Sequence, residues 1–177
     1  MYKSITFIII ALFLTLQNYA QENLDEDSSK EKIHKLAFVF GYTHIPEAFE
    51  EGEEMSSVFV PTIGIDYFLQ IAEKWSIGAV LDYEMQKYKV NFKESELDRE
   101  NAVITGILVG YEFAECWGLL MGPGLEFEKN KNLFIFRAAI EYEFELNNNW
   151  AIVPSVNNDF KEEYSTYALS IGVNKKF

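Results

Sequence analysis

The last fourteen residues of the chain constrain its fold more than any other stretch. They read YSTYALSIGVNKKF, from Tyr164 to Phe177. Counted back from the terminus, every second residue is large and apolar, apart from one lysine, and the residues between them are small or polar. A period of two with unlike faces predicts a β-strand. The length suits a tilted membrane-spanning strand.

Seven further alternating segments precede this strand. The eight expected strands cover residues 34–44, 58–71, 75–90, 101–114, 117–127, 133–146, 150–157 and 164–177. Acidic connections at residues 45–57 and 91–100 alternate with joints of two or three residues. Short periplasmic turns and longer outer loops are typical of outer-membrane barrels. The sequence therefore predicts an all-β fold, an eight-stranded antiparallel up-and-down transmembrane β-barrel over residues 34–177.

The first 33 residues are expected to lie outside the barrel. Residues 1–20 combine an early lysine, a short apolar run and a terminal alanine, which predicts a cleaved secretory signal peptide. A membrane anchor is the alternative, but the run is too short to span a bilayer. Residues 21–33 are acidic and poor in apolar residues, so we expect a disordered acidic periplasmic lead-in.

The size of the side chains indicates which face of the sheet points inward. Nine of the ten glycines lie on the face opposite the bulky apolar residues. An eight-stranded barrel is barely wide enough for side chains, so the small face is expected inside and the bulky face against lipid. A secreted lipocalin-like carrier is the soluble alternative. It should show a Gly-x-Trp start to its first strand and an apolar interior, and the sequence has neither.

Aromatic residues recur at one level of the expected barrel. Trp75, Trp117 and Trp150 each open a strand after a short turn, and Phe177 closes the last strand at the same level. Aromatic rings at the edge of an apolar band are typical of a membrane interface. These four residues therefore predict an interface aromatic belt.

Three prolines lie within the expected strands. A closed sheet has no edge at which the missing N–H of Pro61, Pro123 or Pro154 would be harmless. Pro61 lies near a strand start, and Pro123, between two glycines, indicates a bulge or kink. Nothing in the sequence accounts for Pro154. A partly open or distorted barrel is the alternative that these residues keep open.

The small-residue face also carries charges. Its predicted interior network comprises Asp82, Glu84, Glu112, Arg137 and Glu141. Buried carboxylates need partners or water, so we expect salt bridges around Arg137, with the lower acids wetted at the periplasmic mouth. A narrow cation-binding or cation-selective lumen is the alternative, although so narrow a barrel argues against conduction.

Three stretches, together with the terminal aromatic strand, carry a family resemblance. GYTHIPEAFEEG, GPGLEFE and YEFEL resemble segments of the small OmpA/OmpX-like outer-membrane barrels, and more closely the Bacteroidetes-type outer membrane protein beta-barrel domain. The resemblance covers the whole mature chain and concerns architecture. It implies the outer membrane of a Gram-negative bacterium, contact with its lipid, and recognition of the C-terminal strand by the barrel-assembly machinery.

Composition argues against several functions. The net charge of −13 disfavours nucleic acid and anionic surfaces, and one cysteine permits no intramolecular disulfide. The sequence has no phosphate-binding loop, metal-ligand cluster or Cys–His pair, so no catalytic, cofactor or metal site is expected. The His-x-Ser pairing of outer-membrane deacylases is also absent, so we expect no enzyme.

The favoured function is a structural or interaction barrel. Its polar interior would be plugged, and its acidic outer loops would face a partner that the sequence does not identify. A narrow cation-selective pore is the second functional hypothesis, and a secreted lipocalin-like carrier is the third.

Overall fold

The computed structural model describes residues 33–46, 48–49, 57–92 and 95–177. The expected signal peptide and nearly all of the acidic lead-in lie outside the described residues, as does most of the first acidic loop. The residues from Ile33 to Phe177 form one compact unit. Among the described residues, no helix is long and apolar enough to cross a membrane.

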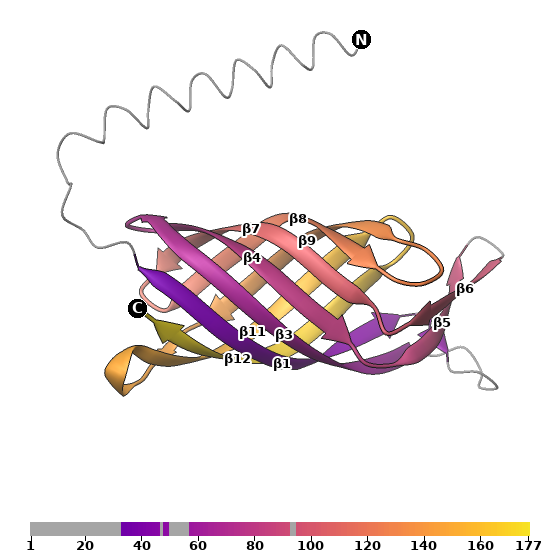
Figure 1. Ribbon diagram of the computed structural model, residues 1–177, viewed down its shortest axis with the longest axis horizontal. Coiled ribbons are helices and arrows are strands. Elements are labelled where there is room, and N and C mark those ends of the chain that lie inside the picture. Colours follow the sequence, from indigo (N-terminus) through magenta and orange to yellow (C-terminus); the bar gives the residue numbers. More distant parts are fainter. Residues whose placement is uncertain (1–32, 47, 50–56, 93–94) are drawn as a thin grey trace, which may run out of the picture. The chain divides into compact units, whose positions relative to one another are not determined.

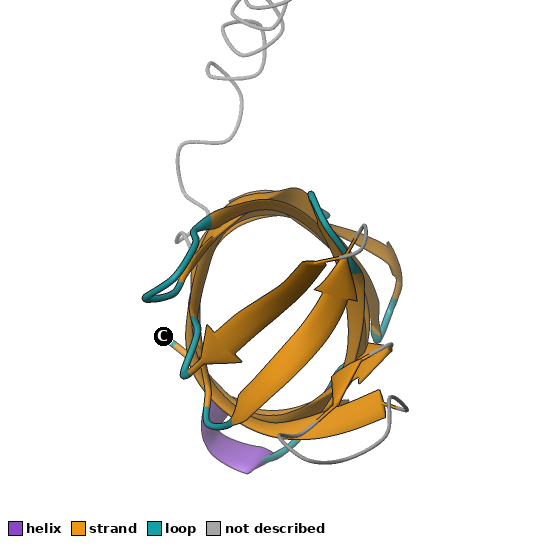
Figure 2. Ribbon diagram, turned by 90° about the vertical axis from the view of Figure 1, so that its right-hand side faces the viewer, coloured by secondary structure: helices purple, strands orange, loops and turns teal. Residues whose placement is uncertain are grey.

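Eight antiparallel strands of the described chain close into a barrel (Figures 1 and 2). Each strand pairs with its neighbours in the chain, and β1 (His34–Pro46) pairs with β12 (Ser165–Lys176) to complete the ring. The short β10 (Phe144–Glu145) continues the line of β9 along β11. The other barrel strands are β3 (Ser57–Ala72), β4 (Trp75–Glu84), β7 (Val103–Ala114), β8 (Trp117–Phe127), β9 (Leu133–Tyr142) and β11 (Trp150–Lys161). The predicted eight-stranded up-and-down barrel is confirmed.

A second, three-stranded sheet continues from one end of the barrel. It consists of β5 (Lys87–Phe92) and β6 (Ser95–Glu100), paired as a hairpin, and β2 (Ala48–Phe49), which pairs with β5. Figure 1 shows this hairpin at the end opposite the C-terminus. We call that end the hairpin end, and the end where β1 begins and β12 finishes the terminal end.

The hairpin corrects two sequence-based expectations. The expected strand over residues 75–90 breaks at Met85, and the expected loop over residues 91–100 contains strand β6. Pro61 gives the physical reason. Met85 donates its N–H to the Pro61 carbonyl at 2.9 Å, but proline has no N–H to donate back. The β3–β4 ladder therefore ends one residue earlier, and the chain continues as β5.

The other two prolines also lie beside interrupted ladders. Pro123 pairs with Phe136 on β9, and the pairing between β7 and β8 lapses on its other side. Pro154 pairs with Ile171 on β12 and faces β9 where that strand gives way to β10. Each proline thus interrupts one of its two ladders, and the ring stays closed. Of the alternative of a partly open or distorted barrel, the open form is therefore wrong, and the distortion is limited to these interrupted ladders.

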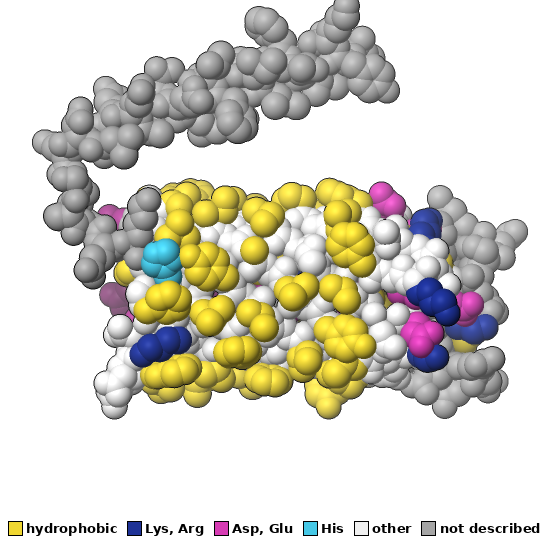
Figure 3. All heavy atoms as spheres, in the orientation of Figure 1, with side chains coloured by type: hydrophobic (Ala, Val, Ile, Leu, Met, Phe, Trp, Pro, Cys, Tyr) yellow, Lys and Arg dark blue, Asp and Glu magenta, His cyan; other side chains and the backbone are white. Residues whose placement is uncertain are grey.

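The two faces of the wall are sharply different. The outer face seen in Figure 3 carries a broad apolar band between the charged ends of the barrel, and outward side chains such as Ile107 and Leu169 are 55% and 66% exposed. The inner face is small. A Cβ added to Gly122 would lie 2.1 Å from the Ile107 carbonyl oxygen, and one added to Gly41 would lie 2.6 Å from the Leu169 carbonyl oxygen. Glycine is therefore required at these inward positions.

Asparagine shapes two of the connections. Asn148 and Asn149, in the 3-10 turn η1 (Asn147–Asn149), and Asn101, between β6 and β7, have φ values of 59°, 62° and 51°. Among residues with a Cβ, asparagine tolerates this left-handed region best. η1 allows the tight turn from β10 into β11, and Asn101 turns the hairpin back into the barrel wall.

Candidate functional site: the lumen of the barrel

Arg137 bridges the middle of the lumen. From β9 it binds Asp159 on β11 through two hydrogen bonds, Nε to Oδ1 at 2.6 Å and Nη2 to Oδ2 at 2.8 Å. Its Nη1 also donates to Asp82 Oδ2 at 2.5 Å. Because β4 and β9 are separated by two strands on one side and by four on the other, the pair with Asp82 crosses the barrel. All three side chains are buried, where a charge needs close partners.

Only some of the predicted interior residues meet at Arg137. Asp82 contacts it, whereas Glu84 lies nearer the hairpin end, and Glu112 and Glu141 line the terminal half of the lumen. Asp159, the bidentate partner, is not among the predicted interior residues, because the expected strand ends at residue 157. The period of two continues through Asp159 to Lys161, and this was the available signal.

A second buried ion cluster seals the hairpin end. Arg99, on β6, pairs with Glu126 on β8, and Glu126 also binds Lys161 Nζ at 2.5 Å. All three side chains are fully buried. Arg99 further donates to the Lys131 carbonyl at 2.6 Å and lies 3.4 Å from a Glu128 oxygen. Arg99 therefore fastens the hairpin to the rim of the barrel.

Glu84 belongs to this sealed end. It accepts a hydrogen bond from Tyr88 at 3.2 Å, and Tyr88 lies 3.3 Å from the Tyr164 hydroxyl. Burial, and then the nearby Glu84, raise the pKa of Tyr88 well above its ordinary value. Apolar residues complete the packing around Tyr88: Ile45, Ala48, Val58, Val60 and Val90.

Lysines and glutamates line the terminal end. Lys35 Nζ lies 2.7 Å from Glu143, and Lys176 pairs with Glu143 and with Glu145. Burial alone would raise the pKa of Glu143, but attraction to Lys35 and hydrogen bonds from both lysines outweigh it. The pKa of Glu143 consequently lies below its ordinary value.

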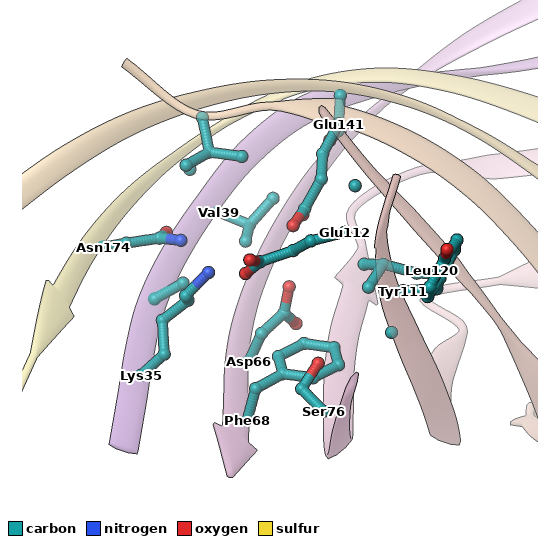
Figure 4. Close-up of a pocket in the computed structure, with 16 residues that line it drawn as sticks. Lys35, Val39, Asp66, Phe68, Ser76, Tyr111, Glu112, Leu120, Glu141 and Asn174 are labelled. Atoms are coloured by element: carbon teal, nitrogen blue, oxygen red, sulfur yellow. The ribbon is translucent and has the colours of Figure 1, made fainter. Parts of the chain in front are cut away.

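Two small cavities with mixed polar and apolar linings lie between this mouth and Arg137. The two cavities have volumes of about 40 and 60 Å³, and both are lined by Asp66, Leu120 and Glu141. Figure 4 shows the first of them. The first cavity shares Lys35 and Glu112 with the cavities at the terminal mouth. The second is bounded by Arg137. The shared lining residues place the first cavity next to the terminal mouth, and each of the two cavities has room for a few waters.

Comparison with known proteins finds the same architecture. No protein-family model and no curated protein sequence matches the chain. The structure is similar to Ail, the attachment invasion locus protein of Yersinia pestis, with a TM-score of 0.52 and 12% identity over 84% of this chain and 100% of that one. It is also similar to Neisserial surface protein A, with a TM-score of 0.53 and 14% identity over 84% and 100%. A third similar structure is the outer membrane protein OprG from Pseudomonas aeruginosa, with a TM-score of 0.54 and 10% sequence identity over 85% of this chain and 99% of that one.

The chain has the fold of the small eight-stranded outer-membrane β-barrels. In this barrel the predicted belt residues lie on the outer surface, near the terminal end: Trp75, Trp117, Trp150 and Phe177. Trp75 packs on Tyr111, with 4.6 Å between ring centroids. Exposed aromatic rings also occur toward the hairpin end: Tyr42, Phe59, Tyr83, Phe127 and Phe160.

The wall of the barrel has the properties that a membrane-spanning protein requires. A closed barrel satisfies its backbone hydrogen bonds internally, as a membrane requires. An apolar band edged by aromatic rings is the surface that contacts lipid in outer-membrane barrels. The protein is therefore an integral outer-membrane barrel, and its wall contacts the lipid of that membrane.

Proposed function

We propose that the protein is a non-conducting outer-membrane barrel that presents its hairpin end to an external partner. The observation that carries this proposal is the double closure of the lumen, by Arg137 in the middle and by Arg99 with Glu126 and Lys161 at the hairpin end. A permeating ion would have to separate both sets of buried ion pairs, and breaking one such pair costs about 3–5 kcal/mol.

The lengths of the connections support an outward-facing hairpin end. Tight turns join β3 to β4 and β7 to β8 at the terminal end, whereas the β5–β6 hairpin and the short β2 that pairs with it lie at the other. Short turns face the periplasm in outer-membrane barrels. In this orientation β12 and Phe177 lie on the periplasmic side, where we propose that the assembly machinery binds them.

The charge of the outer segments favours a basic partner. Residues 47–54, EAFEEGEE, carry five glutamates and no basic residue. One structure of Ail is a complex with the heparin analogue sucrose octasulfate, at a TM-score of 0.53 and 13% identity. For this chain we propose the opposite preference, a partner with a positive surface, because like charges repel polyanions.

Single-channel recording on the refolded protein tests the closed lumen. We expect no conductance steps from protein that shows the gel-mobility shift between boiled and unboiled samples, which reports a closed barrel. Steady cation-selective steps that disappear in Asp82→Asn and Glu141→Gln would overturn the proposal in favour of the narrow cation pore. Both variants replace a carboxylate by an amide of similar size.

The external partner is tested separately by binding. Immobilised refolded protein should retain a basic model protein such as cytochrome c more strongly than a sulfated polysaccharide, and added salt should weaken the retention. Retention of the polysaccharide alone would contradict the charge argument.

A further inference from the structure

The outer wall of the barrel contains a groove of about 510 Å³ that crosses β4, β7 and β8 and reaches β9. It is far larger than either cavity of the lumen. Among the described residues that line it, none is charged, and Thr105 carries the one polar side chain. Its bulky lining residues, Ile107, Leu125 and Phe134, all lie on the exposed apolar face of the wall. The groove is therefore an apolar recess in the face that meets the membrane.

Short outward side chains create this recess. Ale79 on β4 is paired with Ile107 on β7, and Thr105 on β7 is paired with Leu125 on β8. Residues paired across two strands project from the same face of a sheet, so the short members stand beside the bulky ones. Pro123 is also exposed on β8 and lines the same groove. The bulky side chains form the sides of the groove, and the short ones form its floor.

The groove lies in the half of the wall nearer the hairpin end. Leu125 lies two residues before the end of β8, and Phe134 is the second residue of β9. Ala79 lies near the middle of β4. The groove thus extends from the middle of the wall toward the hairpin-end rim, which is the part of the wall that one leaflet of a bilayer covers.

We propose that the groove binds one acyl chain of a lipid in the leaflet nearest the hairpin end. The wall contacts membrane lipid, so the groove is a recess within that interface. Lipid chains are as apolar as the wall, and the hydrophobic effect therefore favours no part of it. The number of close contacts decides instead. A chain in the groove touches the floor and both sides, and each additional contact adds dispersion attraction.

The shape of the groove favours a single chain over a second copy of the barrel. Two convex walls meet along a narrow line, and the side chains of Ile107, Leu125 and Phe134 would hold a second wall away from the floor. A narrow, flexible and uncharged chain can reach the floor. This site goes beyond the proposed function and does not depend on the closed lumen. Only the assignment of the chain to the outer leaflet rests on the orientation proposed above.

Photocrosslinking with a defined lipid tests the groove. Refolded protein is placed in phosphatidylcholine vesicles that contain a small fraction of phosphatidylcholine with a diazirine on one acyl chain, and labelled residues are identified by mass spectrometry. Ile107 is compared with Leu169, because both are exposed aliphatic side chains and each is the fifth residue of a strand that begins at the hairpin end. We expect several-fold more label at Ile107.

Ala79→Phe should fill the groove and reduce the label at Ile107 several-fold. Val156→Phe is the control, because it adds a ring to an exposed position of β11 and should leave that label unchanged. The boiled-against-unboiled mobility shift verifies that each variant is folded. If Ala79→Phe does not refold, Thr105→Leu fills the same groove and replaces it.

Equal label at Ile107 and Leu169 in the wild type would overturn the proposal, because it would show general contact with lipid only. Label at Ile107 that persists when the groove is filled would also overturn it. A dimer on unboiled gels that Ala79→Phe abolishes would assign the groove to a second copy of the chain instead. Conductance is recorded separately, so failure of the lipid site and failure of the closed lumen remain distinguishable.

Discussion

At the scale of single residues, partners determine whether a charge is tolerated inside the barrel. Arg137 lies among strands that cross the membrane, yet it faces the lumen and binds two carboxylates there. A buried ion pair of this kind adds little net stability over an apolar pair, but a single partner left alone is strongly destabilising. The same side chain on the outer face would meet lipid. Whether the charge of Arg137 is tolerated therefore depends on the side of the wall that its side chain faces.

Asp159→Asn should consequently destabilise the barrel. The change leaves Arg137 with only Asp82 as a charged partner, and we expect a loss of about 3–5 kcal/mol in the free energy of unfolding. Urea unfolding of the refolded protein, followed by tryptophan fluorescence, measures this loss. Glu100→Gln removes a carboxylate from an exposed pair with Lys87 and should leave the midpoint almost unchanged. Equal shifts in the two variants would contradict the argument.

Glu143 should contribute to the pH dependence of stability. Its pKa in the folded barrel is lowered, whereas an unfolded glutamate titrates near a pKa of about 4.3. The stabilisation is therefore fully present above the unfolded pKa and is lost as the pH falls through the lower folded pKa. Glu143→Gln should reduce the fall in the urea midpoint between pH 7 and pH 3. An unaltered acid response would indicate that Lys35 and Lys176 do not stabilise the ionised form.

At the scale of elements, the β5–β6 hairpin belongs to the second sheet and not to the barrel wall. It leaves the barrel wall beside Pro61 and is fastened back to the rim by Arg99. The loop between β8 and β9 covers the open edge of β6, since Glu128 accepts the Glu100 N–H at 3.2 Å and Asn130 donates to the Asp98 carbonyl at 3.0 Å. An unprotected strand edge invites pairing with other chains. These contacts shield it.

Arg99→Gln should loosen the hairpin while the barrel persists. The change removes the buried cation that joins β6 to Glu126, so the hairpin should open more readily than the wall strands. Limited proteolysis should then cut the chain within residues 87–100 at a faster rate. Lys87→Gln, a change of the same type at an exposed position of the hairpin, serves as the control. Cleavage in the wall strands first would show that Arg99 stabilises the whole barrel instead.

At the scale of the whole molecule, the barrel is inverted relative to a soluble protein. The bulky apolar side chains face outward along the wall (Figure 3). Charged and small residues are buried on the inner side. This distribution suits lipid outside and a narrow, hydrogen-bonded interior. The lumen is divided along its length into a packed hairpin end, a central arginine and a terminal half that contains small cavities.

Ile107→Arg tests this distribution. Ile107 is exposed on the outer wall of β7, and arginine near the middle of a bilayer costs about 2–4 kcal/mol in barrels of this class. We expect lower stability in lipid vesicles and less protein floating with outer membranes, whereas Ile107→Leu should behave like the wild type. Equal behaviour of the two variants would mean that this face does not contact lipid.

The sequence by itself determined the eight wall strands and their two faces, apart from the break at Met85, the strand β6 and the later end of β11. These properties depend on local periodicity, because side chains alternate along a strand wherever it lies. Tertiary structure decided which interior charges meet. Arg137 and Asp82 are 55 positions apart in the chain, and their contact depends on the register of every strand between them. The roles of Arg99 and Pro154 were decided in the same way, since strand pairing is a relation between distant segments.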